Sequence, residues 1–176
     1  MTDESQTYLD VVGQIIEKLE AHDQTPVLVG GMALVILGSQ RVTKDFDLLI
    51  SEEARNLRVM VQIFYHFGLE LVSKVNKQGE VIRTIDNQKI AYSRLQVDKP
   101  ESAYFYNHKT GLRVDLLFDF PVTAIEVAKK AQKKKIRSHM FTIASKSDLI
   151  RLKEIAYQNR KLASDAQDLE FLKQKL

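Results

Sequence analysis

The chain has 176 residues, no cysteine, a formal net charge of +3 and a hydrophobic fraction of 44%. This composition supports one folded domain with an ordinary core and argues against disorder. The lack of cysteine excludes a disulfide framework, a thiolate nucleophile and a thiolate metal site, and it favours a reducing cytoplasm. The first ten residues lack the apolar stretch of a signal peptide. The longest apolar run, residues 26–38, is too short to span a bilayer, so we expect no membrane partner.

The first half of the chain is predicted to alternate between helix and strand. Leu9, Val12, Ile16 and Leu19 recur at helical spacing, which predicts a helix over residues 7–20. Short apolar runs separated by turn signals then predict a strand at 26–31, a short helix at 32–38, a strand at 45–50, a helix at 52–67 and a strand at 69–75.

Residues 69–120 are predicted to be mostly β. Weak alternation runs through 80–85 and 90–97, and a clearer pair of strands occupies 102–120. After Pro121 the pattern becomes helical to the end of the chain.

This order of elements predicts an α/β (α+β) protein with a mixed β-sheet flanked by helices. The predicted domain covers residues 1–122, and residues 123–176 form a helical segment packed on it. A capping box beginning at Ser145 starts one of these helices near residue 147. The sequence has no Pro- or Gly-rich linker, so we expect the helical segment to pack on the domain and not to form an independent unit.

Two carboxylates share one predicted strand, at Asp45 and Asp47. Residues two apart in a strand point the same way, about 6–7 Å apart, so these charges repel and would be costly to bury. Mg²⁺ would relieve the repulsion, and two such ions would serve the attacking and leaving oxygens of nucleotidyl transfer. The alternative is structural: Asp45 caps the preceding turn and Asp47 lies at an exposed strand end.

A Gly-Gly pair, Gly30 and Gly31, lies between a predicted strand and a predicted helix. Such a turn lets backbone amides approach an anion at the start of a helix, although a glycine pair can also mark a simple tight turn. Together with the carboxylate pair on the next strand, it predicts a phosphate cradle beside a metal site.

The glycine pair, a spacer of thirteen residues and the Asp-Phe-Asp string resemble the signature of the DNA polymerase β-like nucleotidyltransferase superfamily. The lead-in Arg41-x-Thr43-x-Asp45 is similar to one branch, the small bacterial nucleotidyltransferases of the AbiEii type, toxins of abortive-infection systems. The resemblance implies the nucleotidyltransferase fold and two Mg²⁺ ions held by acids that include Asp45 and Asp47. It also implies an NTP substrate whose contacts include Gly30, Gly31, Arg41 and Thr43.

A third acid is expected on a neighbouring strand, and Asp115 is the candidate. It lies mid-strand between apolar residues, where an unpaired charge is penalised. The alternative role is a salt bridge to Arg113 or Arg94. The resemblance implies that the third acid completes the catalytic metal site and activates the attacking hydroxyl, and we assign this role to Asp115. Asp119 points the same way but lies nearer the strand end, which makes it the weaker candidate.

Charged residues also interrupt the apolar stripes of the C-terminal helices. Lys153 lies at the edge of one stripe, and Asp165 lies on the inward face of the last helix with Asp168 beside it. A bridge between Lys153 and Asp165, or snorkelling of the lysine, would explain them structurally. The resemblance implies that Lys153 supports catalysis by contacting the nucleotide phosphates and that Asp165 holds it. Ser164 stands where a basic residue is usual in that branch.

The basic run at 129–137 follows a predicted helix whose alanines face inward, and it is interpreted as either a solvated basic face or an RNA-binding patch. The four histidines show no metal-ligand spacing.

The sequence therefore predicts a cytoplasmic, Mg²⁺-dependent nucleotidyltransferase that moves NMP from an NTP to an acceptor hydroxyl. The AbiEii resemblance implies a toxin of a toxin–antitoxin or phage-defence system, with a tRNA end or a protein as acceptor and a cognate antitoxin as a candidate partner. Two alternatives remain open: transfer to a small molecule such as an antibiotic, and a non-catalytic antitoxin or scaffold with the same fold.

Overall fold

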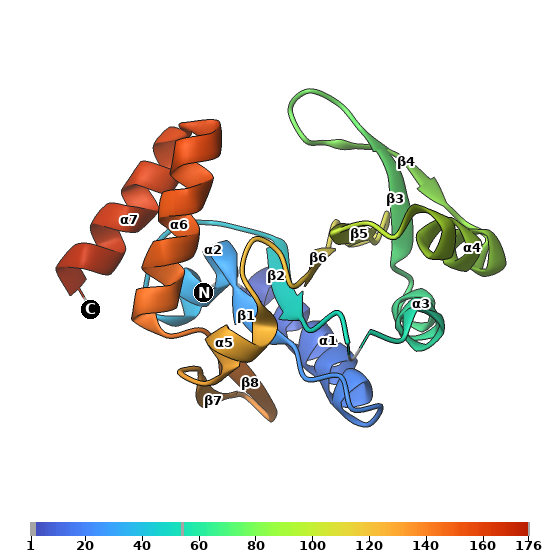
Figure 1. Ribbon diagram of the computed structural model, residues 1–176, viewed down its shortest axis with the longest axis horizontal. Coiled ribbons are helices and arrows are strands. Elements are labelled where there is room, and N and C mark those ends of the chain that lie inside the picture. The colour runs from blue at the N-terminus through green and yellow to red at the C-terminus, as the bar shows by residue number, and fades with distance from the viewer. Residues whose placement is uncertain (1–2, 54, 176) are drawn as a thin grey trace.

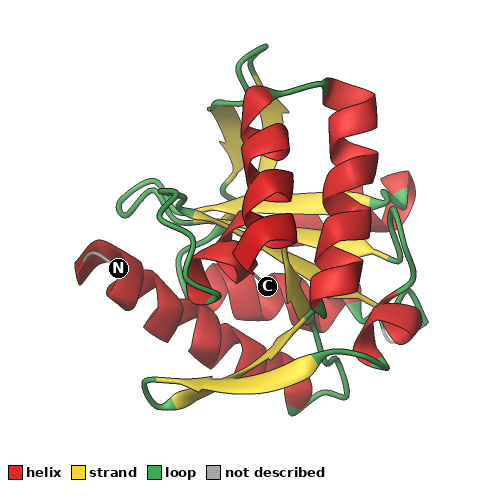
Figure 2. Ribbon diagram, turned by 90° about the vertical axis from the view of Figure 1, so that its left-hand side faces the viewer, coloured by secondary structure: helices red, strands yellow, loops and turns green. Residues whose placement is uncertain are grey.

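The computed structural model describes residues 3–53 and 55–175. In this part of the chain, helices flank a single mixed β-sheet (Figures 1 and 2). The helices are α1 (Asp3–Glu20), α2 (Gly30–Ile36), α3 (Leu57–His66), α4 (Gln88–Asp98), α5 (Ala124–Ala128), α6 (Lys146–Arg160) and α7 (Ala163–Lys175). The strands are β1 (Val27–Val29), β2 (Asp45–Ile50), β3 (Glu70–Val75), β4 (Val81–Ile85), β5 (Ser102–Tyr106), β6 (Arg113–Phe118), β7 (Gln132–Ile136) and β8 (His139–Ile143).

The strands follow the order β4-β3-β5-β6-β2-β1-β8-β7 across the sheet. Strand β2 lies near its centre, antiparallel to β1 and parallel to β6, and β6 is antiparallel to β5. This register places Asp47 directly beside Asp115 on one side and beside Val29 on the other. The topology therefore brings together two carboxylates that are far apart in the sequence.

Alternation along the central strands separates a buried face from a more open one. Phe46, Val114 and Phe105 point to the buried face, where α1 and α3 contact each other and the ring of Phe64 stacks on Phe105 with centroids 4.3 Å apart. The intervening residues of β5 and β6 are half-buried and include Asp115, and those of β2 include the half-buried Asp47 beside the buried Leu49. The acids therefore lie on the face that the hydrophobic core does not use.

The prediction of a C-terminal helical segment is confirmed by α6 and α7, which pack against each other and against α2. The prediction that the chain is helical throughout after Pro121 is wrong, because residues 132–143 form the hairpin of β7 and β8. In β8, Phe141 and Ile143 are buried, and Ile143 pairs with Leu28 of β1. Packing at the sheet edge decides this segment against its local helical pattern.

The basic run that was predicted to be helical is in fact mostly the edge strand β7. Lys133, Lys134 and Lys135 are exposed, and the Lys134 Nζ donates a hydrogen bond of 3.1 Å to the carbonyl of Ile36 at the end of α2. Lysines on an edge strand discourage pairing with other chains, and a lysine at a helix C-terminus satisfies an otherwise unpaired carbonyl. Both of these roles of the β7 lysines are structural.

The expectation that 69–120 is mostly β is wrong for residues 88–98, which form α4. The side chain of Asn87 caps this helix by accepting hydrogen bonds from the amides of Lys89 and Ile90. Ala91 and Leu95, four residues apart, are its buried positions. An N-cap and one short apolar stripe outweigh the weak alternation that predicted a strand.

The division near residue 122 stays a prediction. None of the described helices combines the length and apolar character needed to cross a membrane.

Candidate active site

Four charged side chains form a two-by-two arrangement on the open face of β2 and β6. Asp45 lies opposite Arg113, and Asp47 lies opposite Asp115. Neighbouring strands are about 4.8 Å apart, and residues two apart along a strand share a face. Three acids and one arginine are thus held together by backbone pairing alone.

This arrangement raises the pKa values of Asp47 and Asp115. Burial raises the pKa of Asp47 to about 6, and the nearby charge of Asp45 adds to the effect. Burial likewise raises the pKa of Asp115 to about 7, and Asp47 raises it further, whereas the hydrogen bond from Arg113 opposes the shift. The protein therefore holds negative charge here that its own cations do not fully compensate.

Arg113 is the direct partner of Asp115. Its Nε donates to Asp115 Oδ1 at 2.8 Å, and its guanidinium carbon lies 4.5 Å from the centroid of the Tyr104 ring. A second nitrogen donates to the carbonyl of Gly79, in the β3–β4 turn, at 3.1 Å. The salt bridge to Arg113 that the sequence offered as an alternative for Asp115 is present, whereas Arg94 pairs with Asp98.

The donor set suits a hard divalent cation. Among the described residues no three His, Cys, Asp or Glu side chains are grouped as a metal site, and Asp115 is turned to Arg113. Even so, Asp45, Asp47 and Asp115 present carboxylate oxygens from one face, which is the ligand type that Mg²⁺ prefers. The raised pKa values of Asp47 and Asp115 indicate the charge that such an ion would neutralise. These residues therefore fit the ion that the fold implies.

The glycine pair lies against this group of charges. Gly30 has φ +69°, and a Cβ on it would lie 2.0 Å from Asp47 Oδ2. A Cβ on Gly31 would lie 2.9 Å from the guanidinium carbon of Arg41. Glycine is thus required at residue 30 both for its backbone conformation and for the close approach of the carboxylate. The two halves of the sequence motif are in contact.

A second charged cluster joins the C-terminal helices to the glycine turn. Asp168 pairs with Arg41 and with Lys153, whose Nζ lies 2.7 Å from Asp168 Oδ2 and 3.3 Å from Asp165 Oδ1. Arg160 contacts both oxygens of Asp165 at 3.0 Å. Asp165 and Asp168 are buried and pair with three cations, so this cluster carries one net positive charge. The predicted contact of Lys153 with Asp165 is present, as its structural explanation requires.

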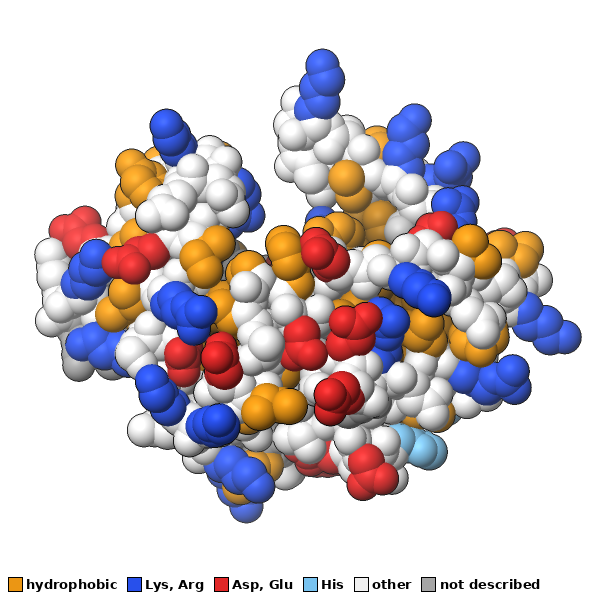
Figure 3. Space-filling view, in the orientation of Figure 1, with side chains coloured by type: hydrophobic (Ala, Val, Ile, Leu, Met, Phe, Trp, Pro, Cys, Tyr) orange, Lys and Arg blue, Asp and Glu red, His pale blue; other side chains and the backbone are white. Residues whose placement is uncertain are grey.

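A cavity of about 250 Å³, here called the α6 cavity, lies between the sheet and α6. Its lining includes Gly30 and the charged residues Asp47, Lys153 and Arg160. The rest of the lining is apolar and is formed mainly by Leu117, Phe120, Pro121, Leu149, Leu152 and Ile155. Figure 3 shows a hollow between the α6–α7 pair and the β3–β4 hairpin, with acidic side chains below it.

Two other sequence candidates have local roles. The Thr43 hydroxyl accepts a hydrogen bond of 3.2 Å from the Asp45 amide, so it shapes the entry into β2. Asp119, the weaker candidate for the third acid, accepts hydrogen bonds from the amides of Glu52 and Ala124. Its carboxylate is thus used to join two loops beyond the end of β6.

Sequence reasoning missed Arg160 and Tyr104. Arg160 follows Lys153 by seven residues, two helical turns, and this spacing could have placed both on one side of α6. Tyr104 was hidden because its position beside Asp115 depends on the register of β5 with β6.

No protein-family model matches the chain, and no curated protein matches it in sequence. Solved structures match its fold. An antigenic nucleotidyltransferase-like protein from Paracoccidioides brasiliensis superposes with a TM-score of 0.59 at 17% identity, over 97% of this chain and 76% of that one. The lincosamide antibiotic adenylyltransferase LnuA gives 0.57 at 12% identity, over 95% and 97%. The antibiotic-resistance factor ANT(2'')-Ia gives 0.60 at 11% identity, over 94% and 82%.

These likenesses show that the chain has the fold of nucleotidyltransferases, a mixed sheet followed by packed C-terminal helices, as the sequence predicted. The AbiEii-type branch stays a prediction.

The contact between Gly30 and Asp47 predicts the effect of adding one methyl group. Gly30→Ala should lower the free energy of unfolding by at least twice as much as Gly111→Ala, measured by urea denaturation. Both positions have similar positive φ, which costs alanine about 1 kcal/mol, but a Cβ on Gly111 meets nothing within 4 Å. Equal losses would mean that the approach of the carboxylate is unimportant.

The raised pKa of Asp47 predicts how the metal-free protein responds to pH. Its folded pKa of about 6 lies above the ordinary value of about 3.9, so the folded state binds the proton more tightly. Stability should therefore fall as pH rises from about 4 to about 7. In EDTA, Asp47→Asn should flatten this slope and raise stability at pH 8 by on the order of 2 kcal/mol. The exposed control Asp86→Asn should keep the wild-type slope, and an unchanged slope in Asp47→Asn would contradict the electrostatic account.

Proposed function

We propose that the protein is a nucleotidyltransferase that moves NMP from an NTP to an acceptor hydroxyl and releases pyrophosphate. The observation that carries the proposal is the in-register pair Asp47 and Asp115 directly beside the Gly30 turn. Both border the open face of a sheet whose fold is that of nucleotidyltransferases. A site with unpaired negative charge, an open glycine turn and nearby cations suits a metal-bound triphosphate.

The nucleotide would lie in the α6 cavity. Its triphosphate would lie beside Gly30 and Gly31, where the absence of side chains leaves backbone amides accessible. Lys153 and Arg160 line the same wall and would contact the phosphates, while Arg41 contacts the turn from the other side. The base and sugar would pack on the apolar wall. The salt bridges to Asp165 and Asp168 would hold these cations in position before the nucleotide binds.

Asp45, Asp47 and Asp115 would hold Mg²⁺, with two ions expected from the resemblance. When bound, the metal would supply charge neutralisation at the phosphates and at the leaving pyrophosphate.

In the transfer step the oxygen of the acceptor hydroxyl attacks the α-phosphorus of the NTP. A new P–O bond forms, and the bond from the α-phosphorus to the bridging oxygen of the β-phosphate breaks. Pyrophosphate leaves with that electron pair. The proton of the hydroxyl passes to the carboxylate of Asp115, which lies directly beside Asp47 on the neighbouring strand. Arg113 orients this carboxylate through its 2.8 Å hydrogen bond.

The acceptor defines two candidate functions. The AbiEii resemblance favours a toxin that modifies a tRNA end or a protein, with a cognate antitoxin as partner. Transfer to a small molecule is favoured by a different observation: the fold match extends over 97% of the chain of a lincosamide adenylyltransferase. The non-catalytic alternative is weakened by the presence of all three acids on one face.

Label transfer tests the proposal. The protein and Mg²⁺ should move label from an α-labelled NTP to a component of cell-extract RNA, protein or small molecules. Asp47→Asn should reduce this transfer by at least about 100-fold, because the metal charge is then poorly held. The control Asp86→Asn, far from the glycine turn in sequence and exposed, should transfer normally. The proposal fails if no fraction is labelled and Mg²⁺ brings no NTP binding.

Thermal stability gives a readout that does not need the acceptor. Mg²⁺ with NTP at about 100 times its dissociation constant should stabilise the folded protein by about 2.7 kcal/mol. Asp47→Asn should remove most of this gain, whereas Asp86→Asn should retain it. A gain of equal size in Asp47→Asn, measured by differential scanning fluorimetry, would exclude a role for this carboxylate in binding metal and nucleotide.

A further inference from the structure

We propose that the β3–β4 turn is a positioning element of the transfer reaction. Through the carbonyl of Gly79 it fixes the guanidinium of Arg113, and Arg113 in turn aims the carboxylate of Asp115. This inference rests on the proposed function. It extends the support of Asp115 from Arg113, on the same strand, to a turn at the far edge of the sheet, and it makes the turn residue Asn76 a positioning residue.

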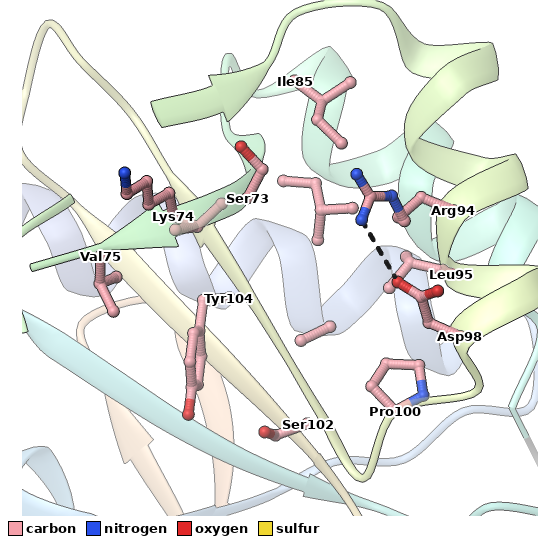
Figure 4. Close-up of a pocket in the computed structure, with 13 residues that line it drawn as sticks. Ser73, Lys74, Val75, Ile85, Arg94, Leu95, Asp98, Pro100, Ser102 and Tyr104 are labelled. Carbon is pink, nitrogen blue, oxygen red and sulfur yellow. Dashed lines mark ion pairs between the residues drawn. The ribbon is translucent and has the colours of Figure 1, made fainter. Parts of the chain in front are cut away.

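The β3–β4 hairpin leaves the rest of the sheet near its base. In the described chain β3 pairs with β5 only through Glu70 and Leu71. Beyond these residues the two strands diverge, and an opening of about 270 Å³ lies between β3, β5 and α4 (Figure 4). The pairing of β3 with β4 also shifts register around Lys74, and such irregularities bend a strand. Most of the hairpin can therefore follow a course of its own.

The tip of the hairpin reaches the open face above β6. Strand β5 separates β3 from β6 in the sheet, yet the Gly79 carbonyl in the β3–β4 turn accepts a 3.1 Å hydrogen bond from Arg113. Arg113 and Asp115 are two residues apart on β6 and share a face. The hairpin must therefore fold back across β5. In Figure 1 its tip is directed toward the side of the sheet where β6 lies.

One guanidinium joins three elements at this point. The Arg113 Nε donates to Asp115 Oδ1 at 2.8 Å, and a second nitrogen donates to Gly79. The guanidinium carbon lies 4.5 Å from the centroid of the Tyr104 ring on β5. In Figure 4 the Tyr104 side chain points away from α4, in agreement with its pairing beside Asp115. Because the guanidinium is planar, two bonded nitrogens and one stacked face restrict it to a single orientation.

The turn is built to hold the Gly79 carbonyl in place. The Asn76 Oδ1 accepts hydrogen bonds of 2.9 Å from the amides of Gln78 and Glu80. The Gly79 amide donates to the Asn76 carbonyl at 3.0 Å. Gly79 has φ +82°, which glycine adopts without steric cost. Asn76 therefore orders the backbone that presents the carbonyl to Arg113, and it acts on Asp115 through these two residues.

This series of contacts decides which oxygen of Asp115 is available. Arg113 holds Oδ1, so Oδ2 is the oxygen left to face the metal and the acceptor hydroxyl. A contact that only tethered the hairpin would not require the tethering side chain to hold a carboxylate of the site as well. A lysine could reach either acceptor but lacks the planar fork that holds both. The use of one arginine for both bonds favours positioning over tethering.

The test measures transfer from α-labelled NTP with Mg²⁺ to cell-extract RNA, protein and small molecules. Asn76→Ala should lower the maximal rate about tenfold and change the apparent KM for NTP less than about threefold, because the glycine turn and α6 still hold the nucleotide. The matched control is Asn87→Ala. It also removes a side chain that accepts from two backbone amides, those of Lys89 and Ile90 at the start of α4, and it should transfer normally.

A double-mutant cycle separates positioning from tethering. Arg113→Lys should lower the maximal rate at least about tenfold, and adding Asn76→Ala should then cost less than about a further twofold, because the turn acts through Arg113. Losses that multiply would overturn the inference. Hydrogen exchange gives a readout without substrate: Arg113→Lys should speed exchange of the Gln78 and Glu80 amides severalfold. Unchanged exchange would also overturn the inference.

Thermal stabilisation by Mg²⁺ and NTP shows that a variant is folded and separates two kinds of failure. If Asn76→Ala does not fold, Gln78→Pro replaces it, since it removes one of the amides bonded to Asn76. Arg113→Gln likewise replaces Arg113→Lys. Normal transfer by a folded turn variant would overturn the inference but leave the proposed function standing, as would stabilisation of the wild type without labelled product. Loss of both labelling and stabilisation in the wild type would overturn the proposed function itself.

Discussion

The repulsion between Asp47 and Asp115 is the constraint around which the rest of the molecule is arranged. Backbone pairing of two parallel strands holds these carboxylates side by side, and burial raises both pKa values. Ordinary packing would favour apolar residues at these two positions, as it does at Phe46 and Val114 on the reverse face. The sheet therefore has one face built for stability and one that holds uncompensated charge.

The protein's own cations reach the two acids unequally. Arg113 is bonded to Asp115 at 2.8 Å, whereas no ion pair of Asp47 is found among the residues that the structure describes. Lys153 and Arg160 lower the pKa of Asp47 only from a distance, because their nitrogens are bonded to Asp165 and Asp168. The unmet charge is thus concentrated at Asp47, next to the Gly30 turn, which is where a metal-bound triphosphate would bring positive and negative charge together.

The sequence predicts the parts of this site that depend on local pattern. The strand of Asp45 and Asp47, the glycine turn and the strand of Asp115 each follow from residues within a short window. Helix α4 was missed although its N-cap at Asn87 is a local signal. The non-local parts that the sequence does not predict are the β7–β8 hairpin beside β1 and the divergence of β3 from β5. These two features depend on which strands pair with one another, and the periodicity of a single strand does not determine its neighbours.

The position of the acids within the strand order has a structural consequence. The α6 cavity is formed by α6 with β1, β2 and β6, whereas the opening between β3, β5 and α4 belongs to the other half of the sheet. Asp115 on β6 stands between them. Substitutions in the strands at the β4 edge would therefore leave Asp47 in place against the Gly30 turn. The strand pairing at that far edge can thus differ while the in-register acids of β2 and β6 keep their positions.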